Sequence, residues 1–162
     1  MLDVVQLAGY FSAHAVWCVA DGETLVPILA SQNVDGTQNF RRIEGPELTE
    51  CVAEGKAWLA APPHEIAIAV LIYDGFIDLP DGKTDALLLD VHSYVSDTTA
   101  IQLAVPYRHA AKQGGFAVHK PKILAFTGAE PNWEAVVQAL FSGVAQHQKG
   151  SVVWNAKLDE SR

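Results

Sequence analysis

The sequence predicts an α+β fold, with a mostly antiparallel sheet of about six strands and three helices in the order α-β-β-α-β-β-β-β-α. Two segments that follow prolines, 46–61 and 131–149, carry apolar residues at the spacing of amphipathic helices. The run 66–73 (IAIAVLIY) is apolar at every position, which is typical of a strand covered on both faces. A turn at 79–83 (LPDGK) separates that run from further strand-like segments, as in an antiparallel meander.

The N-terminal segment 2–13 predicts the first helix. Its apolar residues recur three and four positions apart, and Asp3 lies where the positive end of a helix favours an acid. The apolar positions are Val4, Val5, Leu7, Ala8 and Phe11.

A β-hairpin is predicted next. The runs 15–20 and 24–30 are β-branched and apolar, and Asp21-Gly22 between them is a strong turn signal. Pro27 lies inside the second run, which predicts that this strand is at an edge of the sheet. The polar segment 31–45 that follows is predicted to be a loop.

The second helix is predicted to begin at Gly45-Pro46 and to stop at Pro62-Pro63. Proline suits the first turn of a helix because its missing N–H would be unpaired there. Glutamates at positions 47, 50 and 54 are expected to face water, opposite an apolar stripe. The stripe consists of Leu48, Cys51, Val52, Gly55 and Leu59.

The run 66–73 is expected to be a central strand, followed by strands at 84–95 and 99–107. Gly82 supplies the positive φ that the 79–83 turn needs. Shorter extended segments are predicted at 116–118 and 122–126.

The third helix is predicted to begin at Pro131 and to end near 147–150, where cations and a glycine suit a helix C-terminus. Its apolar stripe consists of Trp133, Val136, Val137, Leu140, Phe141 and Val144. Residues 151–154 are expected to add a short strand or to pack loosely. Residues 155–162 are expected to be a frayed tail, which leaves one domain over 1–154.

Composition excludes several classes of function. The chain has 162 residues and a formal net charge of −8, which disfavours binding to nucleic acid and to anionic membranes. No apolar run approaches the roughly 20 residues that span a bilayer, and the N-terminus lacks a Lys/Arg-rich leader, so a cytoplasmic location is expected. Cys18 and Cys51 are interpreted as small buried residues, with a single bridge between them left open.

The pattern of the central strand predicts a homo-oligomer, with a dimer favoured. Three helices can cover one face of the sheet, which leaves an apolar set exposed on the other. On the central strand that set is Ala67, Ala69, Leu71 and Tyr73. The alternative is that the 31–45 loop and the C-terminal segment cover this face within the monomer.

Charge is distributed unevenly along the chain. Residues 61–105 hold seven acids, Asp97 among them, and one base, whereas residues 106–122 hold four bases, two histidines and no acid. Glycines in the basic loop could bind a carboxylate or phosphate through backbone N–H groups. The residues of this candidate anion site are Arg108, Lys112, Gly114, Gly115 and Lys120. The alternative is a solvated loop that offsets the negative charge of the neighbouring acidic hairpin, residues 74–85.

Two further groups of polar residues have a spacing that could serve chemistry. Asp90, His92 and Tyr94 alternate on one strand face and could supply a general acid/base pair, or simply form a polar stripe at the end of the core. Four aspartates crowd the 79–83 hairpin, but their spacing misses the calcium-loop pattern, so they are interpreted as turn residues. They are Asp74, Asp78, Asp81 and Asp85. No metal site and no cofactor is predicted.

These observations favour a non-enzymatic binding or interaction module that acts as a homo-oligomer. Its partner is expected to be a protein or a small ligand held between sheet and helices. The alternative is a small cytoplasmic enzyme acting on an anionic molecule, with the acidic hairpin facing the basic loop across a cleft. Its site would comprise Asp90, His92, Tyr107, Arg108 and His109, with a histidine as the base and the arginine holding the substrate.

Overall fold

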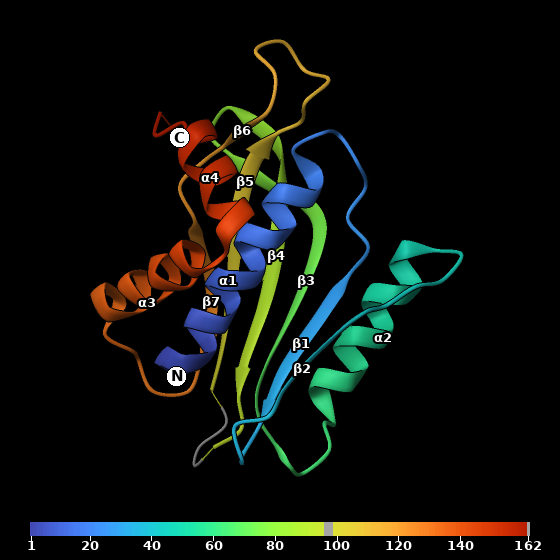
Figure 1. The fold of residues 1–162 in the computed structure, drawn as a ribbon, viewed down its shortest axis with the longest axis vertical. Coiled ribbons are helices and arrows are strands. Elements are labelled where there is room, and N and C mark those ends of the chain that lie inside the picture. The colour runs from blue at the N-terminus through green and yellow to red at the C-terminus, as the bar shows by residue number, and fades with distance from the viewer. Residues whose placement is uncertain (96–98, 162) are drawn as a thin grey trace.

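The computed structural model describes residues 1–95 and 99–161. Within these residues the chain forms one antiparallel sheet of seven strands and four helices, which confirms the predicted α+β class (Figure 1). The helices are α1 (Leu2–Val19), α2 (Leu48–Ala60), α3 (Trp133–Gln146) and α4 (Gln148–Lys157). The strands are β1 (Ile28–Asn33), β2 (Gln38–Arg42), β3 (Ile66–Leu79), β4 (Gly82–Ser93), β5 (Thr99–Arg108), β6 (Ala117–Val118) and β7 (Lys122–Thr127).

The strand order is β2-β1-β3-β4-β5, and both β6 and β7 pair with the outer edge of β5. α1, α3 and α4 share one core with one face of the sheet, where Val70 of β3 and Leu89 of β4 are completely buried. α2 covers the other face, where Leu59 packs with Leu71 and Tyr73. The sheet therefore lies between two layers of helix, and α1 runs along its middle (Figure 1).

The predicted hairpin over 15–30 is wrong, because α1 continues through its first half. Ala15, Val16 and Val19 are buried at helical spacing against the sheet, and this packing overrides their β propensity. The Asp21-Gly22 signal ends the helix instead. Gly22 has a φ of +87° and donates from its N–H to the Val19 carbonyl oxygen at 2.9 Å.

The predicted loop over 31–45 contains a hairpin, formed by β1 and β2. Asp35-Gly36 makes its turn, in which Gly36 has a φ of +88° and Asp35 Oδ1 accepts from the Thr37 N–H at 2.9 Å. Every residue of β2 is exposed, so this strand has none of the apolar alternation by which strands are recognised. β1 lies between β2 and β3, so the edge position inferred from Pro27 is also wrong.

The central elements follow the predictions closely. α2 buries Cys51, Gly55 and Leu59 of the predicted stripe. β3 is buried throughout the run 66–73, and its hairpin with β4 turns at Gly82, which has a φ of +120°.

The apolar set behind the homo-oligomer prediction is covered within one chain. Ala67, Ala69, Leu71 and Tyr73 are all buried, the last three in the core that α2 completes. The prediction assumed that all the helices lie on one face, whereas α2 lies on the other. β3 therefore gives no reason for self-association.

The C-terminal region contains a helix that the sequence analysis did not predict. α3 ends at Gln146, near the predicted position, and α4 begins directly after His147. Residues 151–154 are therefore helical, and Trp154 is only 1% exposed. α4 continues to Lys157 into the predicted tail, and Asp159 then donates from its N–H to the Val118 carbonyl oxygen at 2.7 Å.

Two further features concern membrane-spanning helices and the two cysteines. No helix among the described residues combines the length and the hydropathy needed to cross a membrane. Cys51 is buried and Cys18 half-buried, and both are free thiols rather than a bridge.

Candidate functional site

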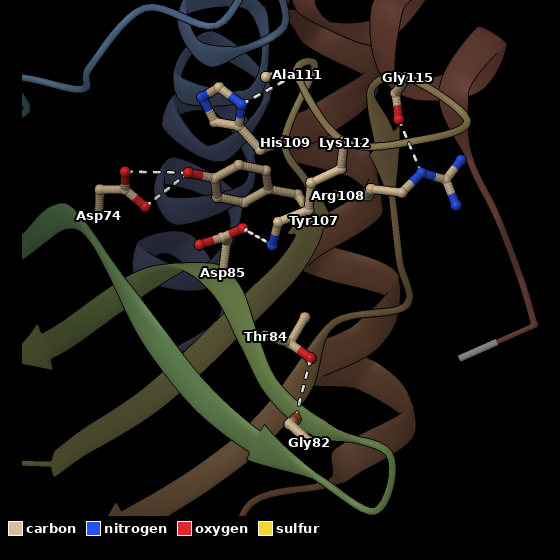
Figure 2. Close-up of polar contacts among 10 residues, drawn as sticks. All are labelled: Asp74, Gly82, Thr84, Asp85, Tyr107, Arg108, His109, Ala111, Lys112 and Gly115. Carbon is tan, nitrogen blue, oxygen red and sulfur yellow. Dashed lines mark hydrogen bonds and ion pairs between the residues drawn. The ribbon is translucent and has the colours of Figure 1, made fainter.

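The acidic hairpin and the basic loop meet where β3, β4 and β5 come together (Figure 2). The Tyr107 hydroxyl donates to both carboxylate oxygens of Asp74, at 2.9 and 3.0 Å. Lys112 of the loop forms an ion pair with Asp85 of β4. The two segments therefore neutralise each other through direct contacts.

The protonation of this cluster suits a structural contact. Burial raises the pKa of Asp74, an effect that the hydrogen bond from Tyr107 opposes. Burial and the neighbouring Asp74 carboxylate raise the pKa of Tyr107 well above its usual range. Tyr107 therefore remains a hydrogen-bond donor and does not act as a base near neutral pH.

The candidate anion site has internal partners. Arg108 Nε donates to the Gly115 carbonyl oxygen at 2.8 Å and Nη2 to that of Gly114 at 3.3 Å, while Nη1 lies 3.7 Å from Asp159 Oδ2. The Gly115 N–H donates to the Lys112 carbonyl oxygen at 2.9 Å. The glycines thus present carbonyl oxygens to the arginine. Lys120 of the same candidate set is exposed.

Asp90 and His92 lie on the sheet face that α2 partly covers, because Leu89 and Val91, with which they alternate, face the α1 core. Asp90 Oδ1 accepts from Gln102 Nε2 at 2.9 Å, and its Oδ2 lies 3.8 Å from Lys56 Nζ of α2. Burial lowers the pKa of His92, which the Asp90 charge opposes.

The third member of that group, Tyr94, has a separate role. Its hydroxyl donates to the Leu59 carbonyl oxygen at the end of α2, at 2.8 Å, and its ring centroid lies 5.9 Å from that of His92. Tyr94 thus ties β4 to α2, as expected of a polar stripe at the margin of a core.

The site predicted for an enzyme divides into two places. His92 pairs with Ala100 in the β4–β5 register, and Arg108 lies eight residues farther along β5. At about 3.3 Å per strand residue, roughly 26 Å separates His92 from Arg108 and His109. Tyr107, Arg108 and His109 lie together at one end of β5, and Asp90 and His92 lie toward the other. Sequence spacing could not reveal this, because it does not contain the register.

The aspartates of the hairpin do not converge. Asp78 lies opposite Lys83 in the β3–β4 register, and Asp85 pairs with Lys112. Within residues 1–95 and 99–161, no three His, Cys, Asp or Glu side chains are placed to hold a metal ion. Asp97 lies outside the described residues.

A cleft of about 740 Å³ lies between α1 and the β1–β2 hairpin. In the β1–β2 register, Phe40 and Gln38 lie opposite Ala30 and Gln32, on the face that α1 covers. The end of α3 completes the cleft through Gln146. Its lining residues are Asp3, Gln6, Leu7, Tyr10, Phe11, His14, Gln32, Gln38, Asn39, Phe40 and Gln146.

The cleft combines aromatic rings with side-chain amides. The Phe11 ring centroid lies 5.5 Å from that of Phe40 and 5.2 Å from that of Tyr10. Gln38 Nε2 donates to Gln32 Oε1 at 2.9 Å. Asp3 is the only carboxylate in the lining and no Lys or Arg belongs to it, so the walls offer hydrogen bonds with little net charge.

A pair of histidines lies at this cleft. His14 Nδ1 is 3.1 Å from His147 Nε2, and His147 Nδ1 accepts from the Gly150 N–H at 2.8 Å. Burial lowers the pKa of both rings, an effect that a backbone hydrogen bond opposes for His147. A nearby cation lowers the pKa further in each case, Arg42 for His14 and Lys149 for His147. His14 Nε2 is shielded from solvent and has no hydrogen-bond partner among the described residues.

The sequence analysis assigned no candidate residue to this cleft. Phe40 and Gln38 fell in a predicted loop, and the two histidines are 133 positions apart in the chain. No periodic signal marked β2, because four of its five residues are polar.

Comparisons with protein-family models, curated proteins and solved structures found no match to this chain. Its function is therefore inferred from the geometry described above.

Proposed function

We propose that the protein is a non-enzymatic binding module. It holds a small, uncharged ligand with a planar ring in the cleft between α1 and the β1–β2 hairpin. The cleft itself carries this proposal. Its volume of about 740 Å³ falls within the roughly 300–1,000 Å³ of small-molecule sites, and it lies between a helix and the sheet.

The lining defines the ligand class. Gln and Asn side chains donate and accept hydrogen bonds without adding charge, so they suit a ligand that bears both donors and acceptors. Phe40 and Phe11 offer ring faces and edges, which favour a planar partner. An uncharged heterocycle with amide-like groups meets both requirements.

Binding is supported over catalysis because the titratable groups that lie together, Asp74 with Tyr107 and Asp85 with Lys112, are paired with each other. An enzyme needs a base, an orienting group and a charge-stabilising group within reach of one substrate. In the cleft, His14 Nδ1 is engaged with His147. Elsewhere, His92 of β4 lies opposite Ala100, eight residues along β5 from Arg108, and Arg108 is bound to backbone carbonyls. The alternative of an enzyme acting on an anionic molecule has less support.

Saturation-transfer NMR tests the proposal, with nicotinamide as the heterocyclic probe and glucose as an uncharged probe without an aromatic ring. We expect transfer to nicotinamide, and about tenfold weaker binding to Phe40→Ala, because an aromatic contact contributes up to roughly 1.5 kcal/mol. Phe76→Ala is the matched control, since Phe76 is 57% exposed and Phe40 58%, and Phe76 lies in the β3–β4 hairpin outside the cleft.

Three results would contradict this function. They are the absence of transfer to nicotinamide, an equal loss of binding in the Phe76→Ala control, and transfer to glucose alone. The last would indicate a site that selects hydroxyl groups rather than planar rings.

Self-association and a cytoplasmic location are also part of the proposal. Free thiols at Cys18 and Cys51 support a reducing compartment.

For self-association we propose the β7–α3 patch, which consists of Ile123, Phe126, Trp133, Val137 and Phe141. Phe126 and Trp133 are in contact, with ring centroids 5.2 Å apart. The β7–α3 patch takes the place of β3 as the dimer surface.

A further inference from the structure

The hydrogen bonds of the histidine pair define where its protons lie. His147 Nδ1 accepts from the Gly150 N–H, so this nitrogen is unprotonated and the proton of the neutral ring is on Nε2. That Nε2–H then donates to His14 Nδ1 at 3.1 Å. His14 Nδ1 is therefore also unprotonated, and its proton is on Nε2. Each ring is neutral, and each unprotonated nitrogen accepts one hydrogen bond.

An added proton breaks one of these two hydrogen bonds wherever it binds. On His147 Nδ1 it would face the Gly150 N–H, and the cap of α4 would be lost. On His14 Nδ1 it would face the His147 Nε2–H. Moving the His147 proton to Nδ1 would relieve that conflict only by removing the same cap. The pair therefore keeps both hydrogen bonds only while its two rings are neutral.

The charged groups around the pair disfavour protonation. Arg42 acts on His14 from β2 and Lys149 acts on His147 from α4, and both are cations. Tyr10 and Trp17 of α1 pack their rings against His147, with centroids 4.9 and 6.4 Å away. Asp3, the carboxylate of the cleft, precedes His14 by eleven residues on α1, or about 16 Å of helix.

Loss of the α4 cap would reach the cleft through adjacent residues. His147 separates α3 from α4, and Gln146 before it lines the cleft, as His14 does. Gly150 packs directly on the Ala13 carbonyl of α1, where a side chain would not fit. A shift at the start of α4 therefore displaces Gln146, His14 or both.

We propose that the His14–His147 pair is a proton switch: its neutral form closes the α1–α4 junction, and its protonation opens the start of α4 and releases the ligand from the cleft. The effect on the ligand rests on the function proposed above, whereas the effect on α4 is a property of the free protein.

The direction of the pH dependence follows from the geometry. A histidine of the unfolded chain binds its proton with a pKa of about 6.5, and the folded pair binds one less readily. The unfolded state therefore holds more protons, and stability rises with pH. The contribution of the pair is fully present above about pH 6.5 and is lost as the pH falls through the lower pKa values of the folded state.

Two measurements on the full chain test the switch. Two-bond ¹H–¹⁵N NMR at pH 7.5 should show His147 protonated on Nε2 and not on Nδ1. Thermal unfolding from pH 8 to pH 5 should then compare the native chain with His147→Asn, because an Asn side chain caps the helix without titrating. The native melting temperature should fall by about 2–4 °C more than that of the variant.

His64→Asn is the matched control, because His64 is exposed and lies outside the cleft. It should keep the native pH dependence. A proton on His147 Nδ1 at pH 7.5, or the same pH curve for His147→Asn and the native chain, would overturn the switch. If His147→Asn does not fold, the Gly150 amide signal of the native chain decides. It must shift together with the titration of the pair below pH 6.5, and a shift at any other pH would contradict the proposal.

The nicotinamide signal, measured at pH 7.5 and pH 5, distinguishes a failure of the switch from a failure of the proposed function. If both hold, the signal is present at pH 7.5, is lost at pH 5 in the native chain, and is retained at pH 5 in His147→Asn. If the stability of the native chain depends on the pair but no probe binds at either pH, the proposed function fails and the switch at α4 stands. If binding is unchanged at pH 5, the link between the switch and the cleft is refuted.

Discussion

Some charged side chains of this sheet are partly buried, so their charge is only partly exposed to water. Asp74 is the clearest case, because it is half-buried at the end of the α1 core and a tyrosine hydroxyl is its hydrogen-bond donor. Burial raises its pKa, so the ionised carboxylate is less favourable in the folded chain than in the unfolded one. The stability that Asp74 contributes is present below its unfolded pKa and is lost as the pH rises through the folded pKa.

Replacement of Asp74 by Asn is therefore expected to leave the protein equally stable or slightly more stable at pH 7, by less than about 1 kcal/mol. The Asn side-chain oxygen can still accept from Tyr107, and the buried charge is removed. The difference should shrink as the pH falls below about 3.9, since Asp74 is then increasingly protonated in the unfolded chain as well. Urea unfolding at pH 7 and pH 3.5 measures this.

Asp78→Asn is the control for this prediction, since Asp78 is an exposed aspartate on the same strand. It should change the free energy of unfolding little at either pH. A loss of more than 1 kcal/mol for Asp74→Asn at pH 7 would mean that the ionised carboxylate stabilises the hairpin.

Residue identity alone could not show which histidines matter. His92 has a carboxylate two positions away and attracted a functional hypothesis, yet that carboxylate is bonded to Gln102. His14 and His147 have no such neighbour in the sequence and nevertheless contact each other. A pair that forms only by packing of α1 against the α3–α4 junction leaves no local spacing to detect.

At the scale of elements, predictions succeeded where burial imposes a clear period. β3 is apolar on both faces, and α2 carries a stripe between two proline signals, so both were placed correctly. The wrong predictions concern a strand that is wholly exposed and a helix that is longer than its sequence pattern indicated. β2 is exposed along its whole length, and the apolar residues that follow position 13 continue α1 rather than starting a strand.

α4 was missed for a different reason. It is ten residues long, and only Gly150 and Trp154 are buried, so its sequence has almost no helical stripe. Trp154 nevertheless lies wholly within the core and contacts Phe141 of α3, with ring centroids 6.2 Å apart. Trp154 is thus the one large side chain of α4 that is fully buried in the core.

Trp154→Ala is expected to reduce the free energy of unfolding by about 3–5 kcal/mol, because a large buried side chain would leave a cavity. Val152→Ala is the matched control on the same helix, since Val152 is 66% exposed, and it should change stability by less than about 0.5 kcal/mol. Denaturant unfolding of both variants measures the difference. Equal small effects would mean that α4 is detached in solution.

At the scale of the whole molecule, the two faces of the sheet are covered unequally. The α1 side carries three helices, whereas the α2 side carries one. At the edge, β7 pairs only with β5 among the described strands, so its outer backbone is open to another strand. Ile123 and Phe126 lie on one face of β7, because their partners Leu103 and Ile101 both face the α1 core. These features support the β7–α3 patch as the contact with a second copy.

Phe126→Asp is expected to convert a dimer into a monomer, because Phe126 is 45% exposed within the β7–α3 patch and a charge there would be buried between two copies. Light scattering at micromolar concentration measures the mass. Phe76→Asp is the control, since its side chain is similarly exposed on a distant hairpin, and it should leave the mass unchanged. A native chain that is strictly monomeric would refute self-association.

Three glycines lie where α1 meets the C-terminal helices. Gly9 rests on the Leu140 carbonyl, Gly143 on that of Gln6 and Gly150 on that of Ala13, each too closely for a side chain. α1 is therefore held by two helices that follow it by more than a hundred residues in the chain. On the ribosome, α1 must wait with its apolar side uncovered until residues 133–157 have left the exit tunnel. A nascent chain stalled before α3 exposes this side of α1 and would be a natural target for chaperones.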